Sequence, residues 1–145
     1  EPEINASMSS GFPDDYIESV EQRLTIYRRL SRLSRVSDIA DMKKELIDRY
    51  GKLPKPAENM LLKIMLRIFA IKAGVRRLDV TPDVLVLEFS TDHMTRNLTD
   101  IETVLKKTVD AKFVKKTCVR IQLGHKRINI SRALLETKQI LSSLC

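Results

Sequence analysis

The spacing of apolar residues changes at Gly74, and that change constrains the fold more than any other feature. Before Gly74, apolar residues recur every three or four positions, which is the period of an amphipathic helix. After it, residues 75–80 and 84–89 are runs of β-branched and apolar residues separated by Thr81-Pro82-Asp83, a pattern typical of a hairpin. Helices followed by mixed strands and helices predict an α+β fold with an antiparallel sheet.

The N-terminal half predicts three helices. The first is expected from a cap at Asp14-Asp15 to about Leu33, and the second from Ser37-Asp38 to the residue before Gly51. The third, from Pro56 to about Ala73, is apolar nearly all round, so we expect it to be packed on most sides. The predicted inward residues are Ile17, Val20, Leu24, Tyr27 and Leu30 in the first helix and Ile39, Met42, Leu46 and Tyr50 in the second.

The C-terminal half predicts strands and two more helices. Residues 119–123 alternate as a strand does, residues 113–114 do so more weakly, and residues 4–8 could form a short edge strand. Helical spacing returns at 97–107 and 128–144, and His93 is expected in a loop. We therefore predict an N-terminal helical half packed with a small antiparallel sheet and a C-terminal helix, in a single domain covering residues 1–145. The predicted inward residues are Leu98, Ile101 and Leu105 in the first of these helices and Ile130, Leu134, Leu135 and Leu141 in the second.

Composition excludes several classes of protein. With 43% hydrophobic and 31% charged residues, the 145-residue chain suits a compact folded domain and not a disordered one. Its most apolar stretch, residues 60–73, contains three bases and is too short to cross a bilayer. Two cysteines make no disulfide framework, which favours a reducing cytoplasm. The chain starts with Glu-Pro-Glu and lacks a leader, so we expect a piece excised from a larger protein.

No catalytic, cofactor or metal site is predicted for this domain. The four glycines are too dispersed for a phosphate-binding loop, and Gly124-His125-Lys126 is interpreted as a turn after a strand. No serine has the glycines of a nucleophile elbow, and Cys118 is expected to be a small core residue. The two histidines and two cysteines lack the spacing of zinc ligands.

Basic residues raise the possibility of nucleic-acid binding. The net charge is +7, and arginines at 28, 29, 32 and 35 recur at spacings that could form one basic ridge on the first helix. However, the chain has no Trp, three Tyr and four Phe, which gives little material for stacking on bases. The alternative is that Arg28, Arg29, Arg32 and Arg35 lie on a solvated helix face.

The most specific constellation lies near the end of the second helix. Glu45 and Asp48 are three residues apart and therefore share a face. One interpretation is an ordinary solvated surface, with Glu45 paired to Arg49 and Lys44 paired to Asp48. However, an acid in the last turn opposes the helix dipole at a cost of about 0.3–1 kcal/mol. The other interpretation is that these acids serve a basic partner surface.

Three motifs follow one another along the first half of the chain. They are Pro13-Asp14-Asp15-Tyr16-Ile17, the segment from Arg23 to Leu30, and Glu45-Leu46-Ile47-Asp48-Arg49-Tyr50-Gly51 followed by Leu53-Pro54. In order and spacing these motifs resemble the C-terminal domain of the bacterial transcription-repair coupling factor, most strongly over residues 12–80 and more weakly from 90 onward. Tyr50 departs mildly from that family's pattern, which more often has Phe there.

The resemblance implies a regulatory domain of a larger bacterial, cytoplasmic ATP-dependent DNA translocase. The parent protein would bind ATP and Mg, displace stalled RNA polymerase from DNA and recruit nucleotide excision repair through UvrA. This domain, itself not an enzyme and without a cofactor, would dock on the parent's own N-terminal UvrB-like domain. Docking would mask the UvrA-binding surface and repress the motor, with Glu45, Asp48 and Arg49 in the interface. No membrane partner is expected.

Overall fold

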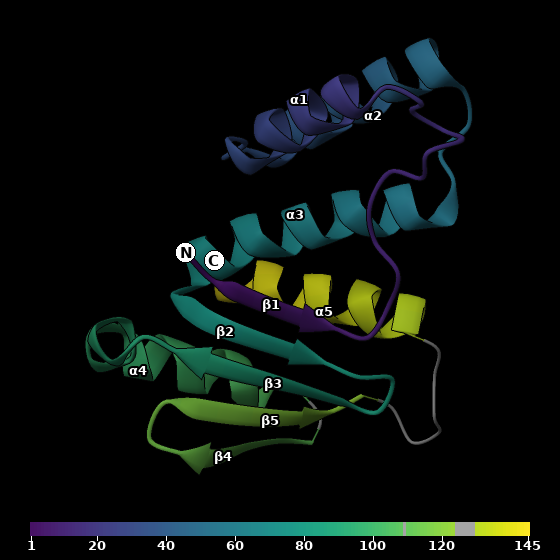
Figure 1. Ribbon diagram of the computed structural model, residues 1–145. Coiled ribbons are helices and arrows are strands. Elements are labelled where there is room, and N and C mark those ends of the chain that lie inside the picture. Colours follow the sequence, from purple (N-terminus) through teal and green to yellow (C-terminus); the bar gives the residue numbers. More distant parts are fainter. Residues whose placement is uncertain (109, 124–129) are drawn as a thin grey trace. The chain divides into compact units, whose positions relative to one another are not determined.

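The computed structural model describes residues 1–108, 110–123 and 130–145. Close contacts divide these residues into two compact units. One comprises residues 8–68, and the other comprises residues 1–7 together with residues 69–145. The prediction that the chain forms a single domain stays a prediction. Figure 1 shows the elements of both units.

The unit of residues 8–68 is helical. It contains α1 (Val20–Ser31), α2 (Val36–Tyr50) and the first turns of α3 (Lys55–Ala73). Apolar residues from all three helices and from the connecting segments make its core. Asn59 is a buried polar residue of this unit, and its amide donates to the carbonyl of Ser9 at 2.9 Å. The core residues are Phe12, Ile17, Ile26, Leu30, Ile39, Met42, Leu46, Leu53, Ala57, Leu61, Ile64 and Ile68.

Helix α1 begins later than the sequence predicts. Its cap is Ser19, whose hydroxyl accepts from the Gln22 N–H, and not the Asp14-Asp15 pair. Ile17 enters the core from a turn before the helix, so it does not set the helical phase. The inward stripe follows Ile26 and Leu30 instead, which leaves Val20 60% and Leu24 47% exposed. The prediction that those two residues point inward is wrong.

Helix α2 has the predicted stripe but a different start. Ile39, Met42 and Leu46 are buried, and Tyr50 packs at the edge of the core. The N-cap is Arg35, two residues before the predicted cap at Ser37, and it makes no side-chain capping bond. Gly51 follows the last turn with φ of 90°, a backbone conformation that favours glycine.

The second unit is built on a mixed five-stranded sheet with the order β1-β2-β3-β5-β4. The predicted hairpin is confirmed, and its strands β2 and β3 pair antiparallel, with Leu78 opposite Leu87. The predicted edge strand forms as well, but it pairs parallel to β2, so the sheet is mixed where an antiparallel sheet was expected. Two parallel strands need a long connection, and in the sequence β1 and β2 are separated by the whole of residues 8–68. The strands are β1 (Glu3–Ala6), β2 (Val75–Val80), β3 (Val84–Phe89), β4 (Ala111–Lys115) and β5 (Cys118–Gln122).

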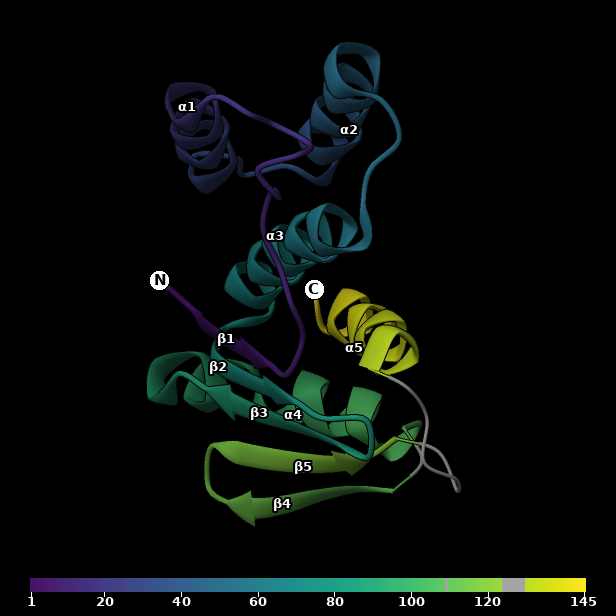
Figure 2. The same cartoon turned by 45° about the vertical axis from the view of Figure 1, so that its right-hand side comes forward.

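Two helices, α4 (Thr91–Lys106) and α5 (Ile130–Leu144), cover one face of this sheet (Figures 1 and 2). Helix α4 starts six residues before the predicted helix, and its cap is Ser90. The helix is kinked at Asn97, where φ is −122°, and this kink interrupts the regular helical spacing of apolar residues between its first turns and the rest. Met94, Ile101 and Leu105 point inward, whereas Leu98 in α4 and Leu135 in α5 are exposed, contrary to prediction.

Gly74 joins α3 to β2 in a conformation that side chains disfavour. Its φ is 71°, and a Cβ there would lie within 2.4 Å of three atoms of the His93 ring. His93 lies in the first turn of α4, so the prediction that it lies in a loop is wrong. Its ring is stacked on that of Phe89 at a centroid distance of 6.4 Å. The missing side chain at Gly74 is what lets α4 approach the end of α3.

Candidate interaction site

Glu45 and Asp48 share a helix face, as predicted, but their surroundings differ. Glu45 is half-buried at the junction of α2 with α1. The guanidinium of Arg29 in α1 donates to both oxygens of this carboxylate, at 2.5 and 2.8 Å. The predicted ion pair with Arg49 is confirmed at an N–O distance of 3.5 Å, which is longer than an ordinary hydrogen bond. Hydrogen bonds from Arg29 hold the pKa of Glu45 below its ordinary value, and burial opposes them.

Asp48 is exposed to solvent. Within the part of the chain that the structure describes, its carboxylate forms neither a hydrogen bond nor an ion pair, so the predicted pair with Lys44 does not form. Its neighbour Ile47 is also exposed, by 43%, although it belongs to an otherwise well-packed helix. An unpaired carboxylate beside an exposed apolar side chain, at the negative end of a helix, is a surface suited to a basic partner.

Tyrosines fix the end of α2 against the rest of its unit. The Tyr16 hydroxyl lies within hydrogen-bond distance of the carbonyls of Leu46 and Gly51, at 3.2 and 2.9 Å. Burial raises the pKa of Tyr16. The ring of Tyr16 packs against that of Tyr50, and the Arg49 guanidinium lies 4.9 Å from the centre of the Tyr50 ring. Arg49 is thereby held between Tyr50 and Glu45.

The structure does not place the four arginines of the alternative nucleic-acid face on one helix. Only Arg28 and Arg29 belong to α1, because Arg32 is its C-cap and Arg35 is the N-cap of α2. Arg29 is engaged by Glu45, and Arg35 pairs with Asp38 at 3.5 Å. The expectation that all four arginines lie on the first helix is therefore wrong, because the helix ends at Ser31, and a nucleic-acid face made by them stays a prediction.

Two contacts that organise this unit were missed by sequence reasoning. The pair between Arg29 and Glu45 joins residues 16 positions apart, which no helical spacing reveals. Arg67 in α3 donates to the carbonyls of Leu30, Ser31 and Leu33, where α1 ends. The spacing of charged residues within one helix does not predict either contact, because each contact joins residues of different helices.

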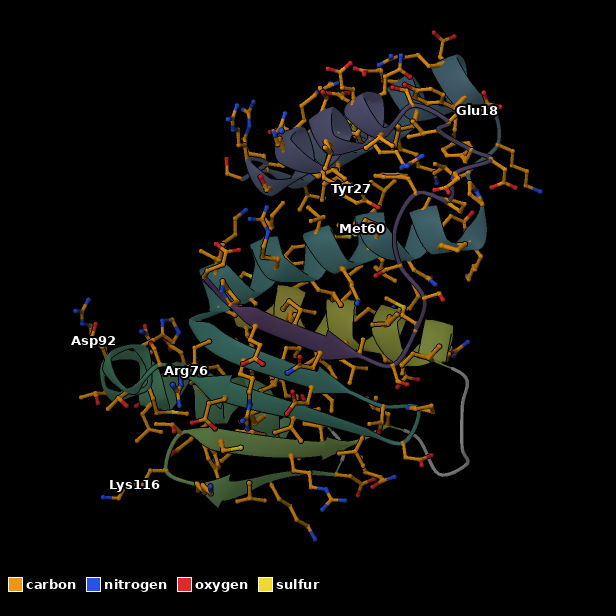
Figure 3. The ribbon with its side chains drawn as sticks, in the orientation of Figure 1. Glu18, Tyr27, Met60, Arg76, Asp92 and Lys116 are labelled. Atoms are coloured by element: carbon orange, nitrogen blue, oxygen red, sulfur yellow. The ribbon has the colours of Figure 1, made fainter. Side chains whose placement is uncertain are left out.

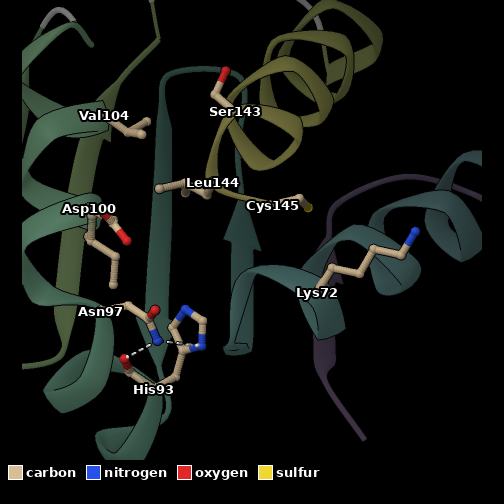
Figure 4. Close-up of a pocket in the computed structure, with 9 residues that line it drawn as sticks. Lys72, His93, Asn97, Asp100, Val104, Ser143, Leu144 and Cys145 are labelled. Atoms are coloured by element: carbon tan, nitrogen blue, oxygen red, sulfur yellow. Dashed lines mark hydrogen bonds between the residues drawn. The ribbon is translucent and has the colours of Figure 1, made fainter.

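The second unit contains a cavity of about 360 Å³. Figure 4 shows the His93 ring beside the Asn97 amide, which donates to the His93 carbonyl at 3.0 Å. Among the described residues around this cavity no nucleophile is hydrogen-bonded to a base, so the cavity has no assembled acid–base relay. Its lining residues are Lys72, His93, Asn97, Asp100, Ile101, Val104, Ser143, Leu144 and Cys145.

Other chemical groups are accounted for by packing. Cys118 is a buried core residue of β5, as predicted, and burial raises the pKa of its thiol. Residues 124–126, predicted as a turn, lie outside the described residues. In the described ranges, no three His, Cys, Asp or Glu side chains are grouped as metal ligands would be. None of the described helices combines the length and the apolar composition that a membrane crossing requires.

The helical unit and the mixed five-stranded sheet define the class of protein as an α+β domain. The chain belongs to the TRCF domain family, whose sequence model matches residues 7–99. Over 88 residues it is 39% identical to the transcription-repair-coupling factor of Myxococcus xanthus and to that of Escherichia coli, which covers 56% and 61% of this chain. The chain spans only 7% and 8% of those two relatives.

A solved structure has the same fold. A crystal structure of the C-terminal domain of transcription-repair coupling factor matches with a TM-score of 0.84. The match covers 99% of this chain and 91% of the solved chain, at 19% sequence identity. The predicted α+β class is thus confirmed, although the sheet is mixed and not antiparallel.

Proposed function

We propose that this chain is the regulatory C-terminal domain of a transcription-repair coupling factor and docks on the N-terminal UvrB-like domain of the same protein. Docking covers the surface that UvrA would bind and represses the motor. The parent protein binds ATP and Mg, displaces stalled RNA polymerase from DNA and couples transcription to nucleotide excision repair. The names of the relatives and the family membership support the parent's role in repair.

The exposed, unpaired carboxylate of Asp48 is the observation that carries the docking proposal. A negative charge in the last turn of a helix costs about 0.3–1 kcal/mol, and no base of the described chain forms an ion pair with this one. An arginine of a partner domain would offset this cost. The exposed Ile47 would supply apolar contact beside that ion pair.

Glu45 is expected to contribute less to docking than Asp48. Its carboxylate already binds the Arg29 guanidinium through two hydrogen bonds. A partner arginine would have to share or replace this internal partner, so the net gain is small. A polar contact of this kind is weak when the two domains are separate and effective when they are tethered, because the tether raises their effective concentration.

The test compares single substitutions in the full-length protein, measured as ATPase rate and affinity for UvrA. We expect Asp48→Asn to raise both, Glu45→Gln to raise both less, and the double variant to raise them most. The matched control is Asp15→Asn, which removes the same charge from an exposed residue before α1 and should change neither. Unchanged UvrA affinity in the double variant would contradict the docking proposal.

A further inference from the structure

We propose that the outer edge of β4 binds an acidic, extended peptide segment of another protein, which joins the sheet as an additional strand. β4 is the last strand in the sheet order, and no described strand pairs with its outer side. Figure 1 shows β4 at the margin of the sheet. A free strand edge is a template for pairing with another chain.

The backbone of β4 presents its polar groups at this edge. The N–H of Gln122 in β5 donates to the carbonyl of Asp110, the residue just before β4, at 3.2 Å, so Asp110 faces β5. In an antiparallel pair, successive residues alternate between facing the partner strand and facing away. The alternation therefore turns the N–H and C=O groups of Ala111 and Phe113 away from β5, where an added strand can bind them.

An apolar groove lies along one side of the same edge. Phe113 is opposite the buried Val119, which places it on the helix-covered face of the sheet, yet Phe113 remains 44% exposed. The groove beside it has a volume of about 280 Å³. Apolar side chains of an added strand would fill this groove and cover Phe113. The residues that line it are Glu102, Leu105, Lys106, Ala111, Lys112 and Phe113.

The charges of β4 select an acidic partner. Lys112 is opposite Arg120 on the other face of the sheet, and Lys115 and Lys116 follow. Within the described chain none of these four bases forms an ion pair, and Lys116 points away from the sheet in Figure 3. The lysines also disfavour a second copy of β4, because like charges would face each other. The fitting segment therefore alternates acidic residues, on the Lys112 face, with apolar residues, on the Phe113 face.

The test titrates the isotope-labelled 145-residue chain with the capped heptapeptide Glu-Val-Glu-Phe-Glu-Val-Glu and follows the backbone amides by NMR. We expect the shifts to centre on β4 and hydrogen exchange to slow at the Ala111 and Phe113 amides. Versions of the peptide are N-methylated at the apolar or at the acidic positions, because an added strand turns only alternate amides toward β4. One version should lose at least about tenfold in affinity, while the other keeps it. Equal binding of both versions would overturn the proposal.

Matched protein variants test the role of charge. Lys112→Glu should weaken binding of the acidic peptide at least about threefold, since it reverses one facing charge. Lys52→Glu makes the same change at an exposed residue outside the sheet and should leave affinity unchanged. Dispersed amide spectra for both variants show that they remain folded. Equal affinity for a peptide with Lys in place of Glu, or self-association of the chain through β4, would overturn the proposal.

Discussion

At the scale of single residues, Glu45 and Asp48 show how neighbours on one helix face acquire different properties. Arg29 lies on another helix, and its guanidinium forms a bidentate hydrogen bond with the Glu45 carboxylate. Asp48 forms no ion pair with any described base and faces solvent. The first acid therefore contributes to the cohesion of its unit, whereas the second is available to a partner.

This difference predicts a pH-dependent effect of Glu45→Gln on stability. Because the folded-state pKa of Glu45 is lowered, its stabilising effect is full above the unfolded pKa of about 4.3 and is lost as the pH falls through the lower folded value. We expect Glu45→Gln to reduce the free energy of unfolding by about 0.2–1 kcal/mol at neutral pH, the range of an exposed pair. The reduction should shrink toward about pH 3.

Urea unfolding of the wild type and the variant at both pH values measures this effect. Asp48→Asn is the control, because it should leave the free energy of unfolding unchanged or raise it by up to about 1 kcal/mol through the helix dipole. A deficit in Glu45→Gln that stays the same at both pH values would show that the carboxylate charge is not its cause.

At the scale of elements, the end of α1 depends on a side chain from another helix. The last carbonyls of a helix lack intrahelical donors. Arg67 supplies donors to three carbonyls at this end, at distances between 2.8 and 3.3 Å. Arg67 therefore ties the C-terminal end of α1 to α3.

Arg67→Met should therefore destabilise the helical unit. Hydrogen bonds from a charged donor contribute about 1.5–3 kcal/mol, so we expect a loss of that size in the free energy of unfolding. Chemical denaturation followed by circular dichroism measures the loss. Lys63→Met, at a base of the same helix without a described ion pair, should cost less than about 0.5 kcal/mol. Equal losses in the two variants would refute the capping role.

At the scale of the whole molecule, net charge and function are separable. The chain carries +7, yet two of the four arginines that would form a nucleic-acid face are engaged in ion pairs with acids of the same unit. A positive net charge favours weak, salt-sensitive attraction to phosphates, but it does not by itself make a binding surface.

We therefore expect the isolated chain to bind duplex DNA only weakly. A titration at two salt concentrations, followed by fluorescence anisotropy, should give a dissociation constant weaker than about 10 μM near physiological salt, within the non-specific range. Tight binding with a steep salt dependence, abolished by joint substitution of Arg28 and Arg32 with Gln, would instead support the nucleic-acid alternative.

The sequence by itself determined the α+β class, the hairpin of β2 and β3 and the stripe of α2. Local periodicity and turn residues specify these features without distant contacts. The motifs around Tyr16, Tyr27 and Asp48 also identified the family.

Only the tertiary structure decided which face of α1 is buried, that β1 pairs parallel to β2, and that Glu45 binds Arg29. Each of these features depends on residues far apart in the chain. The spacing of residues within one helix or strand does not predict which distant residue will contact it. The docking role of Asp48 stays a prediction, because the spacing within one helix does not reveal what its exposed face would bind.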